Sequence, residues 1–389
     1  MRIGVAGPSD LATFQQNGLE VPQLKVHHFP YIAELALEYS AKGHEVHVFT
    51  TSPMIDEVVY LEASPSFSVT IIPQRRSNRR ALDMFRLERD ALASEMRKSR
   101  LEVIHSHWLY EYSSAALATG VPTLVTCHDA PFSVLRHYRG VYWWFREILG
   151  IRVLLAAKHL TAVAPSLEQE LRRTSFWTKQ IVVVPNGVKH QASEPTARPL
   201  EPSKVTFACI AKGFSRRKNS SKAIEAFARL SDDVRAHARL LLIGSGHEEN
   251  GDAHSWAQTQ KMDLQNIHFL GELPHQQVVD YLHSSIDVLV HPSRWEACSL
   301  AIIEAGARGI PTIGGQHSGG VGFTIGGARC GFPVNVRKVG EIAHAMRCCI
   351  LEEDRISAKS VKISRYVHEK FDLEDVIESY LEHLNRIRR

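Results

Sequence analysis

The chain has 389 residues, which is too long for one ordinary core and fits two domains of Rossmann size. Hydrophobic residues make up 44% and charged residues 23%, as in soluble globular proteins, and no run of about 18 apolar residues appears that could span a membrane. The net charge of +4 does not indicate nucleic-acid binding, and the six scattered cysteines lack metal-ligand spacing, which favours a structural role in a reducing cytoplasm.

The first half of the chain alternates between strand and helix patterns. Residues 2–6 predict a buried strand that ends in a loop at Gly7, and this opening segment is too short and too rich in Gly and Pro for a signal peptide. Helical spacing follows over 30–41, and Gly43 ends that helix. Further strands are predicted at 46–50, 68–72 and 102–106.

Two segments in this part of the chain are basic. The arginine-rich run at 75–80 favours a solvated face, and the alternative is contact with an anionic lipid surface or a lipid diphosphate acceptor. Residues 132–160 combine arginines with Tyr and Trp, which suits either core and rim packing or contact with an acceptor or a membrane.

Two predicted strands end in histidines. His105 and His107 are two residues apart, so their side chains should share one face of the sheet, and His128 follows the next strand. No carboxylate cluster accompanies them, so we expect no metal ion. The alternative to a functional role for His128 is a hydrogen-bonded structural histidine.

A second strand–helix series begins at 205, after a polar, Pro-rich stretch. The strand predicted at 205–211 leads into the loop KGFSRRKN, residues 212–219, and then into a helix at 221–230. A strand, a basic loop containing glycine and a helix together form a phosphate cradle. Gly244 follows another strand, at 240–243, but the third glycine of a dinucleotide fingerprint is missing there.

Residues 286–315 have the clearest pattern in the chain. An apolar, β-branched run at 286–290 predicts a strand buried on both faces, and Pro292 ends it. Apolar residues with helical spacing predict a helix over 300–307, which a glycine and a proline close. The loop between strand and helix therefore lies at the carboxyl end of the sheet, where open α/β sheets bind ligands.

Two glutamates in this stretch suit a nucleoside diphosphate. The helix starts near Ser299 or Leu300, so its free amides favour an anion. Glu304 lies about 7 Å further along the helix axis, roughly the offset between a diphosphate and its ribose. The ribose hydroxyls can donate hydrogen bonds to a carboxylate at that position. Glu296 would face the other end of the same ligand. The alternative is that both glutamates are solvated surface residues.

The residues around these glutamates resemble a family signature. Pro292-Ser293 before Glu296, and the pattern Glu-Ala-x-Ala-x-Gly-x-Pro from Glu304, are similar to glycosyltransferase family 4, the large retaining family with the GT-B fold. The string ELALEYSAKGHEVHVFT, residues 34–50, also resembles that family's second strand and preceding helix. Residues 162–166 and 181–185 resemble the last strands of the family's first domain, which predicts strands there. The resemblance covers nearly the whole chain.

The resemblance implies an α/β GT-B fold of two Rossmann-like, doubly wound domains that face each other across a cleft. It implies an acceptor domain at 1–190, a linker at 191–204, a nucleotide-sugar donor domain at 205–370 and a helix at 371–389 that crosses back to the first domain. It also places Lys212 and Lys218 on the donor diphosphate and His128 at the reaction centre. The residues expected to take part in catalysis are His128, Lys212, Lys218 and Glu296. Those expected at the donor are Gly7, Arg217, Gly244, Ser299, Leu300 and Glu304, and those at the acceptor are His107, Trp108 and Asp129.

The expected activity is a retaining, metal-independent transfer of a sugar from a UDP- or GDP-sugar to a hydroxyl group. The acceptor would be a glycan or a lipid-linked intermediate of cell-surface polysaccharide, such as lipopolysaccharide, synthesis, and we expect no cofactor and no nucleic-acid partner. We expect a cytoplasmic protein with peripheral contact to the inner membrane. The alternatives are an inactive nucleotide-sugar-binding protein and a GT-B sugar-nucleotide epimerase.

Overall fold

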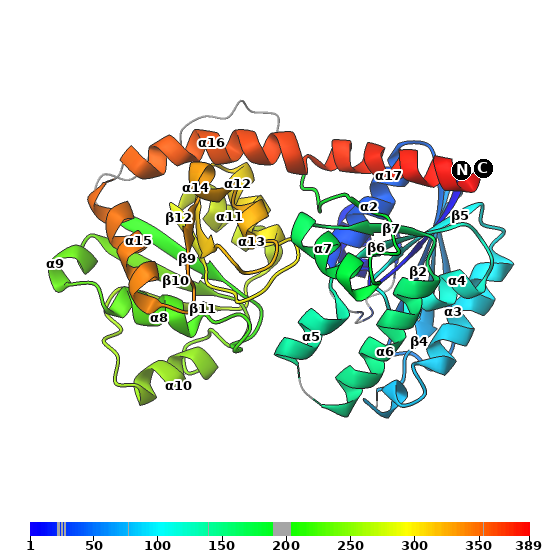
Figure 1. Cartoon of the computed structure of the whole chain (residues 1–389), viewed down its shortest axis with the longest axis horizontal. Helices are drawn as coiled ribbons and strands as arrows, with labels where there is room; N and C mark the ends of the chain where they lie inside the picture. The colour runs from blue at the N-terminus through cyan, green and yellow to red at the C-terminus, as the bar shows by residue number, and fades with distance from the viewer. Residues whose placement is uncertain are drawn as a thin grey trace. The chain divides into compact units, whose positions relative to one another are not determined.

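The computed structural model describes residues 1–389 apart from 22–23, 25, 27–28, 77, 139, 190–203 and 353. The described residues form two compact units, one of Met1–Pro185 with Glu374–Arg389 and the other of Asn186–Leu373 (Figure 1). Each unit has its own largely parallel sheet, which confirms the predicted α/β class with two Rossmann-like domains. The predicted linker at 191–204 lies, except for Lys204, outside the described residues.

The first unit contains a sheet with strand order β3-β4-β2-β1-β5-β6-β7-β8. Neighbouring strands are parallel, except that β3 and β4 form an antiparallel hairpin at one edge. The strands are β1 (Arg2–Ala6), β2 (Glu45–Ser52), β3 (Val59–Ser64), β4 (Phe67–Pro73), β5 (Val103–His107), β6 (Thr123–Cys127), β7 (His159–Ala162) and β8 (Ile181–Val183). Because β1, β5 and β6 are parallel neighbours, the loops that carry Gly7, Trp108 and His128 leave the same edge of the sheet.

Helices connect these strands, and one predicted strand is wrong. The helices are α1 (Leu11–Gln16), α2 (Pro30–Ala41), η1 (Asn78–Ala81), α3 (Arg86–Lys98), α4 (Glu111–Ala118), α5 (Pro131–His137), α6 (Val141–Ala156), α7 (Pro165–Thr174) and α17 (Leu373–Arg388). The strand predicted at 162–166 is instead the end of β7 and the start of α7. Pro165 begins that helix because its fixed φ and its missing N–H suit the first helical position.

The carboxyl-terminal helix α17 packs on the first unit. Lys42 of the first unit forms ion pairs with Glu374, at 3.0 Å, and with Glu378. The ring of the buried Tyr380 lies 4.6 Å from the ring of His105, between centroids, and Arg388 binds Glu102 at 3.0 Å. Apolar burial and charge pairing therefore join residues that are far apart in the sequence.

The second unit contains a six-stranded parallel sheet with strand order β11-β10-β9-β12-β13-β14. The strands are β9 (Val205–Ile210), β10 (Ala238–Ile243), β11 (Ile267–Gly271), β12 (Val288–His291), β13 (Thr312–Gly315) and β14 (Phe332–Val334). The helices are α8 (Ser221–Ala228), α9 (Asp232–Arg235), α10 (Asp252–Thr259), α11 (His275–Ser284), α12 (Leu300–Ala307), α13 (Val321–Thr324), α14 (Gly327–Cys330), α15 (Val339–Leu351) and α16 (Asp354–Phe371).

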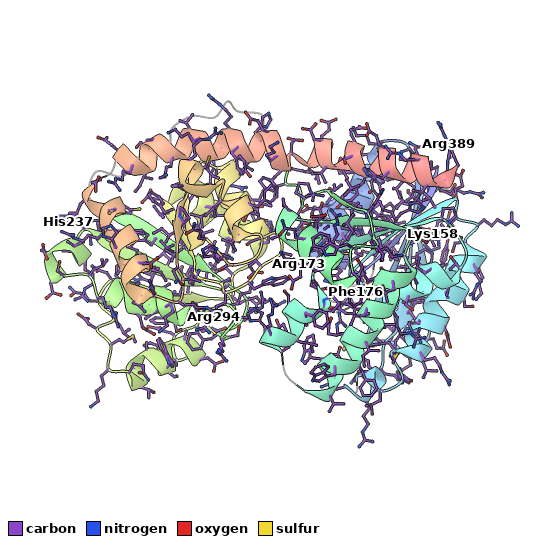
Figure 2. All side chains as sticks on the ribbon, in the orientation of Figure 1. Lys158, Arg173, Phe176, His237, Arg294 and Arg389 are labelled. Atoms are coloured by element: carbon purple, nitrogen blue, oxygen red, sulfur yellow. The ribbon has the colours of Figure 1, made fainter. Side chains whose placement is uncertain are left out.

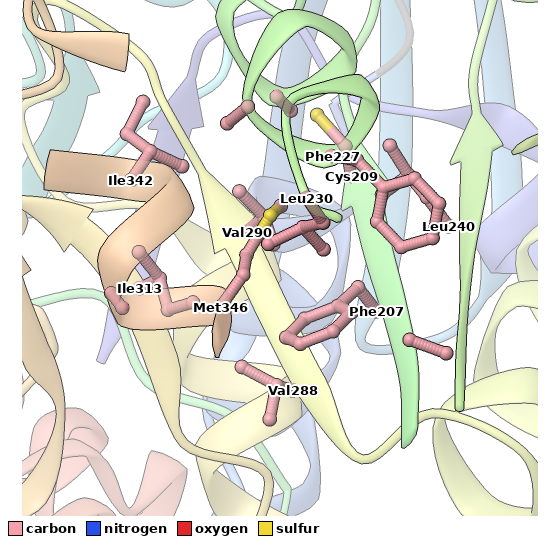
Figure 3. Packing of buried hydrophobic residues seen from close by; sticks show 14 of the residues in the cluster. Phe207, Cys209, Phe227, Leu230, Leu240, Val288, Val290, Ile313, Ile342 and Met346 are labelled. Atoms are coloured by element: carbon pink, nitrogen blue, oxygen red, sulfur yellow. The ribbon is translucent and has the colours of Figure 1, made fainter. Parts of the chain in front are cut away.

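Both faces of this sheet are covered, which explains why its strands are apolar throughout. Phe207 of β9 packs with Phe227 of α8 and Met346 of α15 on one face (Figure 3). The next residue along the strand, Ala208, joins a separate apolar cluster with Ile302 of α12 on the other face. Burial of a large apolar side chain contributes about 1.5–3 kcal/mol. The two cores hold the strand ends, and hence the loops that follow them, in fixed positions.

Candidate active site

The basic loop after β9 is fixed by its backbone and by one buried asparagine. Gly213 has a φ of +83° and its N–H donates to the carbonyl of Ser245 at 3.0 Å. Asn219, in the left-handed region at φ 56°, donates from Nδ2 to the carbonyls of Pro292 and Val336, both at 3.0 Å. Asparagine tolerates this backbone conformation better than most residues do. The loop therefore holds Lys218 at a defined place beside β12.

Two cations of this loop converge on Glu296. Lys218 Nζ lies 2.7 Å from Glu296 Oε1, and Arg217 Nη1 lies 3.0 Å from the same oxygen. Although burial opposes ionisation, the charges of Lys218 and Arg217 lower the pKa of Glu296 to about 2. Three residues predicted from the sequence, two from one loop and one from another, thus form one charged cluster.

His291, at the end of β12, lies against this cluster and was not predicted. Its Nε2 is 3.8 Å from Glu296 Oε1, and burial lowers its pKa to about 4, so the ring is neutral near pH 7. This nitrogen makes no hydrogen bond within the described part of the chain. The only sequence signal was its place directly before Pro292 at a strand end.

The backbone of Glu296 is paired with the loop after β13. Its N–H donates to the carbonyl of Ser318 at 3.2 Å, and its carbonyl accepts from Gly320 at 2.7 Å. Gly319 has a φ of +67°, and a Cβ there would lie 2.5 Å from the Glu296 carbonyl oxygen. The glycine pair therefore allows two backbones to approach closely and so orients the carboxylate.

Helix α12 begins at Leu300, as predicted. Ser299 precedes it with extended backbone and makes no side-chain capping bond, so the first amides of the helix have no acceptor within it. Glu304 is partly buried on this helix, and its carbonyl accepts from Arg308 at 2.8 Å. A single strand–loop–helix unit thus carries Glu296, Ser299, Leu300 and Glu304.

Two other residues predicted in this unit are not joined to the cluster. Lys212 is exposed at the start of the loop, and no contact links it to Glu296 among the described residues. Gly244 has a φ of +117°, and a Cβ there would lie 2.1 Å from the carbonyl oxygen of Ala211. Close packing of two strand ends therefore explains Gly244 without any ligand.

In the first unit, the predicted histidines do meet. His107 Nδ1 lies 3.0 Å from His128 Nε2, and the ring of Trp108 lies 4.4 Å from that of His128, between centroids. Gly7 lies beside them, because a Cβ there would be 3.2 Å from His107 Cβ. Burial lowers the pKa of His128 to about 3 and that of His107 well below its usual value, so both rings are neutral.

His105 and His107 share one face, as the strand period predicted, with ring centroids 4.2 Å apart. Both ring nitrogens of His105 are hydrogen-bonded, Nδ1 with Tyr39 at 2.9 Å and Nε2 with Thr126 at 2.7 Å, so its role is structural. Across the described residues, no group of three His, Cys, Asp or Glu side chains is arranged to hold a metal ion.

A buried acidic cluster next to His128 was missed. Asp129 lies near Arg146, whose guanidinium stacks 3.6 Å from the ring centroid of Tyr110, and Tyr110 donates to Glu147 at 3.0 Å. Burial raises the pKa of Glu147 to about 8 and that of Asp129 to about 6. Only the chain fold brings Asp129 and Glu147 together, so nothing in the sequence indicated the cluster.

The basic run at 75–80 is not simply a solvated face. Arg75 pairs with Asp83 at 2.8 Å and with the buried Glu88 at 2.7 Å, and so fastens the loop to α3. Arg76 donates to the carbonyl of Pro53 at 2.9 Å. Both side chains are used within the protein, which contradicts the interpretation of the whole run as free surface charge. Ser77 of this run lies outside the described residues.

Comparisons with known proteins identify related families for both units. Residues 30–192 match the profile of Glycosyltransferase Family 4, and residues 194–367 match that of Glycosyl transferases group 1. Glycogen synthase of Mycobacterium tuberculosis is 25% identical over 279 residues, which cover 69% of this chain and 64% of the relative. This chain therefore spans less than two thirds of that relative's length.

Two solved structures show the same fold. Sucrose-phosphate synthase from Thermosynechococcus elongatus has a TM-score of 0.78 at 19% identity, covering 100% of this chain and 99% of the other. WaaG, a glycosyltransferase involved in lipopolysaccharide biosynthesis, has a TM-score of 0.70 at 15% identity, covering 98% of this chain and 99% of the other.

Proposed function

Because the chain belongs to glycosyltransferase family 4 and the glycosyl transferases of group 1, we propose that it transfers a sugar from a nucleoside-diphosphate sugar to a hydroxyl acceptor. The anomeric configuration would be retained and no metal ion would be needed. The observation that carries this proposal is the convergence of Lys218 and Arg217 on Glu296 beside the start of α12.

The chemical task is to stabilise the diphosphate as it leaves. When the anomeric C–O bond breaks, its electron pair goes to the diphosphate oxygen, and negative charge grows there. Preorganised cations and backbone amides are suited to hold such charge. Lys218, Arg217 and the first amides of α12 supply these groups, and exposed Lys212 would add a further cation.

The acceptor hydroxyl then bonds to the anomeric carbon and loses its proton. In a front-face displacement the departing phosphate takes that proton, so no carboxylate nucleophile is required. We assign His128 to the reaction centre, and His107, Trp108 and Asp129 to the acceptor. The neutral His107–His128 pair supports this role, because a neutral imidazole can both donate and accept hydrogen bonds from sugar hydroxyls.

The acceptor we propose is a glycan or a lipid-linked intermediate of cell-surface polysaccharide synthesis, reached from the cytoplasmic side. The likeness to WaaG supports this class. The donor base would be uridine or guanosine, with Glu304 accepting hydrogen bonds from the ribose hydroxyls.

A peripheral contact with an anionic membrane would follow from the outer face of α6. Val141, Trp144, Ile148 and Leu155 are 62%, 59%, 41% and 47% exposed at intervals of three, four and seven residues, and thus form one apolar stripe. Arg152 is exposed on the same helix, and the exposed Lys158, labelled in Figure 2, follows its end. Across the described residues, no helix is both long and apolar enough to cross a bilayer.

Vesicle sedimentation tests this contact. Trp144→Ala should reduce binding to vesicles of anionic phospholipid, because it removes the largest exposed apolar side chain of the stripe. Phe176→Ala is the matched control, since Phe176 is 83% exposed but follows α7 instead (Figure 2). Equal losses for both variants, or no binding by the wild type, would count against the α6 surface.

The donor proposal is tested by thermal stabilisation with a panel of UDP- and GDP-sugars, followed by calorimetry with the best one. Glu304→Ala should weaken that affinity sharply, whereas Glu369→Ala, on the exposed surface of α16, should not. Unchanged affinity of Glu304→Ala would remove the ribose assignment.

Turnover assays decide among the three functional alternatives. Binding without transfer to any acceptor would favour an inactive nucleotide-sugar-binding protein, and an epimerised donor formed without acceptor would favour an epimerase. Full transferase activity after exhaustive chelation is expected, and a loss that added metal restores would defeat the metal-independent proposal.

A further inference from the structure

A surface cavity of about 320 Å³ lies beside the ends of β13 and β14 in the second unit. Its polar lining comes from three loops: Arg294 follows β12, His317 and Ser318 follow β13, and Asn335 and Arg337 follow β14. Arg294 is labelled in Figure 2. Neither Lys218 nor Glu304 lines this cavity. The backbones of Arg294 and Ser318 are hydrogen-bonded to those of Arg217 and Glu296, so the cavity adjoins the proposed donor site but has a different lining.

The cavity is positively charged without a compensating acid. Arg294 and Arg337 line it. Burial, and then the positive charges of the nearby Arg216 and Arg337, lower the pKa of Arg294. No Asp or Glu belongs to the lining, and none of the three arginines forms an ion pair within the part of the chain that the structure describes.

The acidic side chains near this segment already have partners. Glu341 accepts from the Asn335 N–H at 2.8 Å and pairs with Lys338 at 3.2 Å. Glu296 is held by Lys218, as shown above. Arg294 donates from Nε to Asn219 Oδ1 at 3.2 Å, and its two terminal nitrogens make no hydrogen bond among the described residues. These N–H groups are therefore free to bind an anion.

We infer that this cavity binds the phosphate group of a small phosphomonoester. Two arginines with planar donor groups match the oxygens of a phosphate, and Ser318 and Asn335 add neutral polar groups suited to hydroxyls. The volume is at the low end for a ligand site, and the lining contains no Phe, Tyr or Trp that would stack on a base. A small phosphorylated polyol fits these features better than a nucleotide does. It could be a free ligand or a phosphorylated acceptor.

The test is a calorimetric titration of the full chain with inorganic phosphate and with glucose 6-phosphate, in chloride buffer without donor. Glucose serves as the uncharged control. Saturable binding of glucose 6-phosphate, with a contribution from phosphate alone and none from glucose, is expected. Arg337→Gln and Arg294→Gln should each weaken it roughly tenfold or more, because each removes charge-assisted hydrogen bonds.

Lys338→Gln is the matched control. It removes the same charge one residue further along but does not line the cavity, so it should weaken binding by less than about twofold. Arg337 is exposed, so its variant tests the site even if Arg294→Gln fails to fold.

Three outcomes would overturn the inference: no saturable binding by the wild type, equal losses for Arg337→Gln and Lys338→Gln, or a loss confined to Lys218→Ala. The last would place the phosphate at the proposed donor site instead. Incubation with UDP- and GDP-sugars separates the two sources of the phosphate. A gain of one glycosyl mass on the glucose 6-phosphate identifies an acceptor, and an unchanged ester identifies a free ligand.

Discussion

Lys218 Nζ lies 2.7 Å from Glu296 Oε1, although the two residues are 78 positions apart in the sequence. The carboxylate offsets the charge of both Lys218 and Arg217, so the two cations can be held close together without strong mutual repulsion. Glu296 of this cluster lies in the loop just before α12, and the cluster is the core of the proposed donor site.

Lys218→Ala should lower kcat about 10²–10³-fold, because one preorganised donor to the leaving diphosphate is lost. The preference among donor sugars should change little. The control is Lys222→Ala, since Lys222 pairs with Glu225 at 2.7 Å on α8 and does not contact Glu296. Steady-state kinetics with the preferred donor measure both variants, and wild-type turnover for Lys218→Ala would refute its role.

The protein should lose stability as the pH falls below about 6.5. Burial lowers the pKa of His105 and of His128 to about 3, so protons bind these rings more tightly in the unfolded chain. Each of these histidines should lower the free energy of unfolding by about 1.4 kcal/mol at pH 5.5, and this loss should grow toward pH 3. Urea unfolding at pH 7.5 and 5.5 measures the difference.

A histidine variant checks the source of this acid sensitivity. His105→Gln should be less stable than the wild type at pH 7.5 but should show a smaller further loss at pH 5.5. His275→Gln, at an exposed position on α11, should keep the full pH dependence. An unchanged slope for His105→Gln would show that other groups cause it.

Glu147→Gln should stabilise the protein in mildly alkaline solution. Burial raises the pKa of Glu147 to about 8, above its unfolded value, so the wild type loses stability as the pH rises from about 4.5 through 8. Gln remains neutral and can still accept from Tyr110. The free energy of unfolding at pH 8 should rise by at least about 1 kcal/mol.

Thermal or urea unfolding at pH 8 and pH 5 checks this, with Glu369→Gln on exposed α16 as the control. The gain should shrink toward pH 5, where Glu147 of the wild type is protonated. A variant that is less stable than the wild type at pH 8 would contradict the buried, neutral carboxyl.

Gly244→Ala should destabilise the second unit more than Gly213→Ala does. Both glycines have positive φ, which costs an alanine roughly 1–2 kcal/mol. The Cβ at 213 meets open space, whereas the Cβ at 244 would lie 2.1 Å from the Ala211 carbonyl oxygen. Unfolding free energies of the two variants isolate the clash, and equal losses would mean that the strand ends can separate freely.

The sequence by itself determined the elements and the local spacing within them. Helix α12 and the interval from Glu296 to Glu304 were predictable, because a strand, a proline break, a helical apolar period and a glycine–proline stop are all local signals. The resemblance to the family misplaced a strand at 162–166, where β7 ends at Ala162 and Pro165 starts a helix.

Only the tertiary structure decided which charges meet. It paired Lys218 with Glu296, fastened Arg75 to Glu88 and buried Glu147 near Asp129, and it left Arg294 and Arg337 together without an acid. The physical reason is that periodicity and turn chemistry act between residues that are near in sequence. Desolvation and Coulomb energies depend instead on distances in space, which the packing of helices on the sheet within each unit sets.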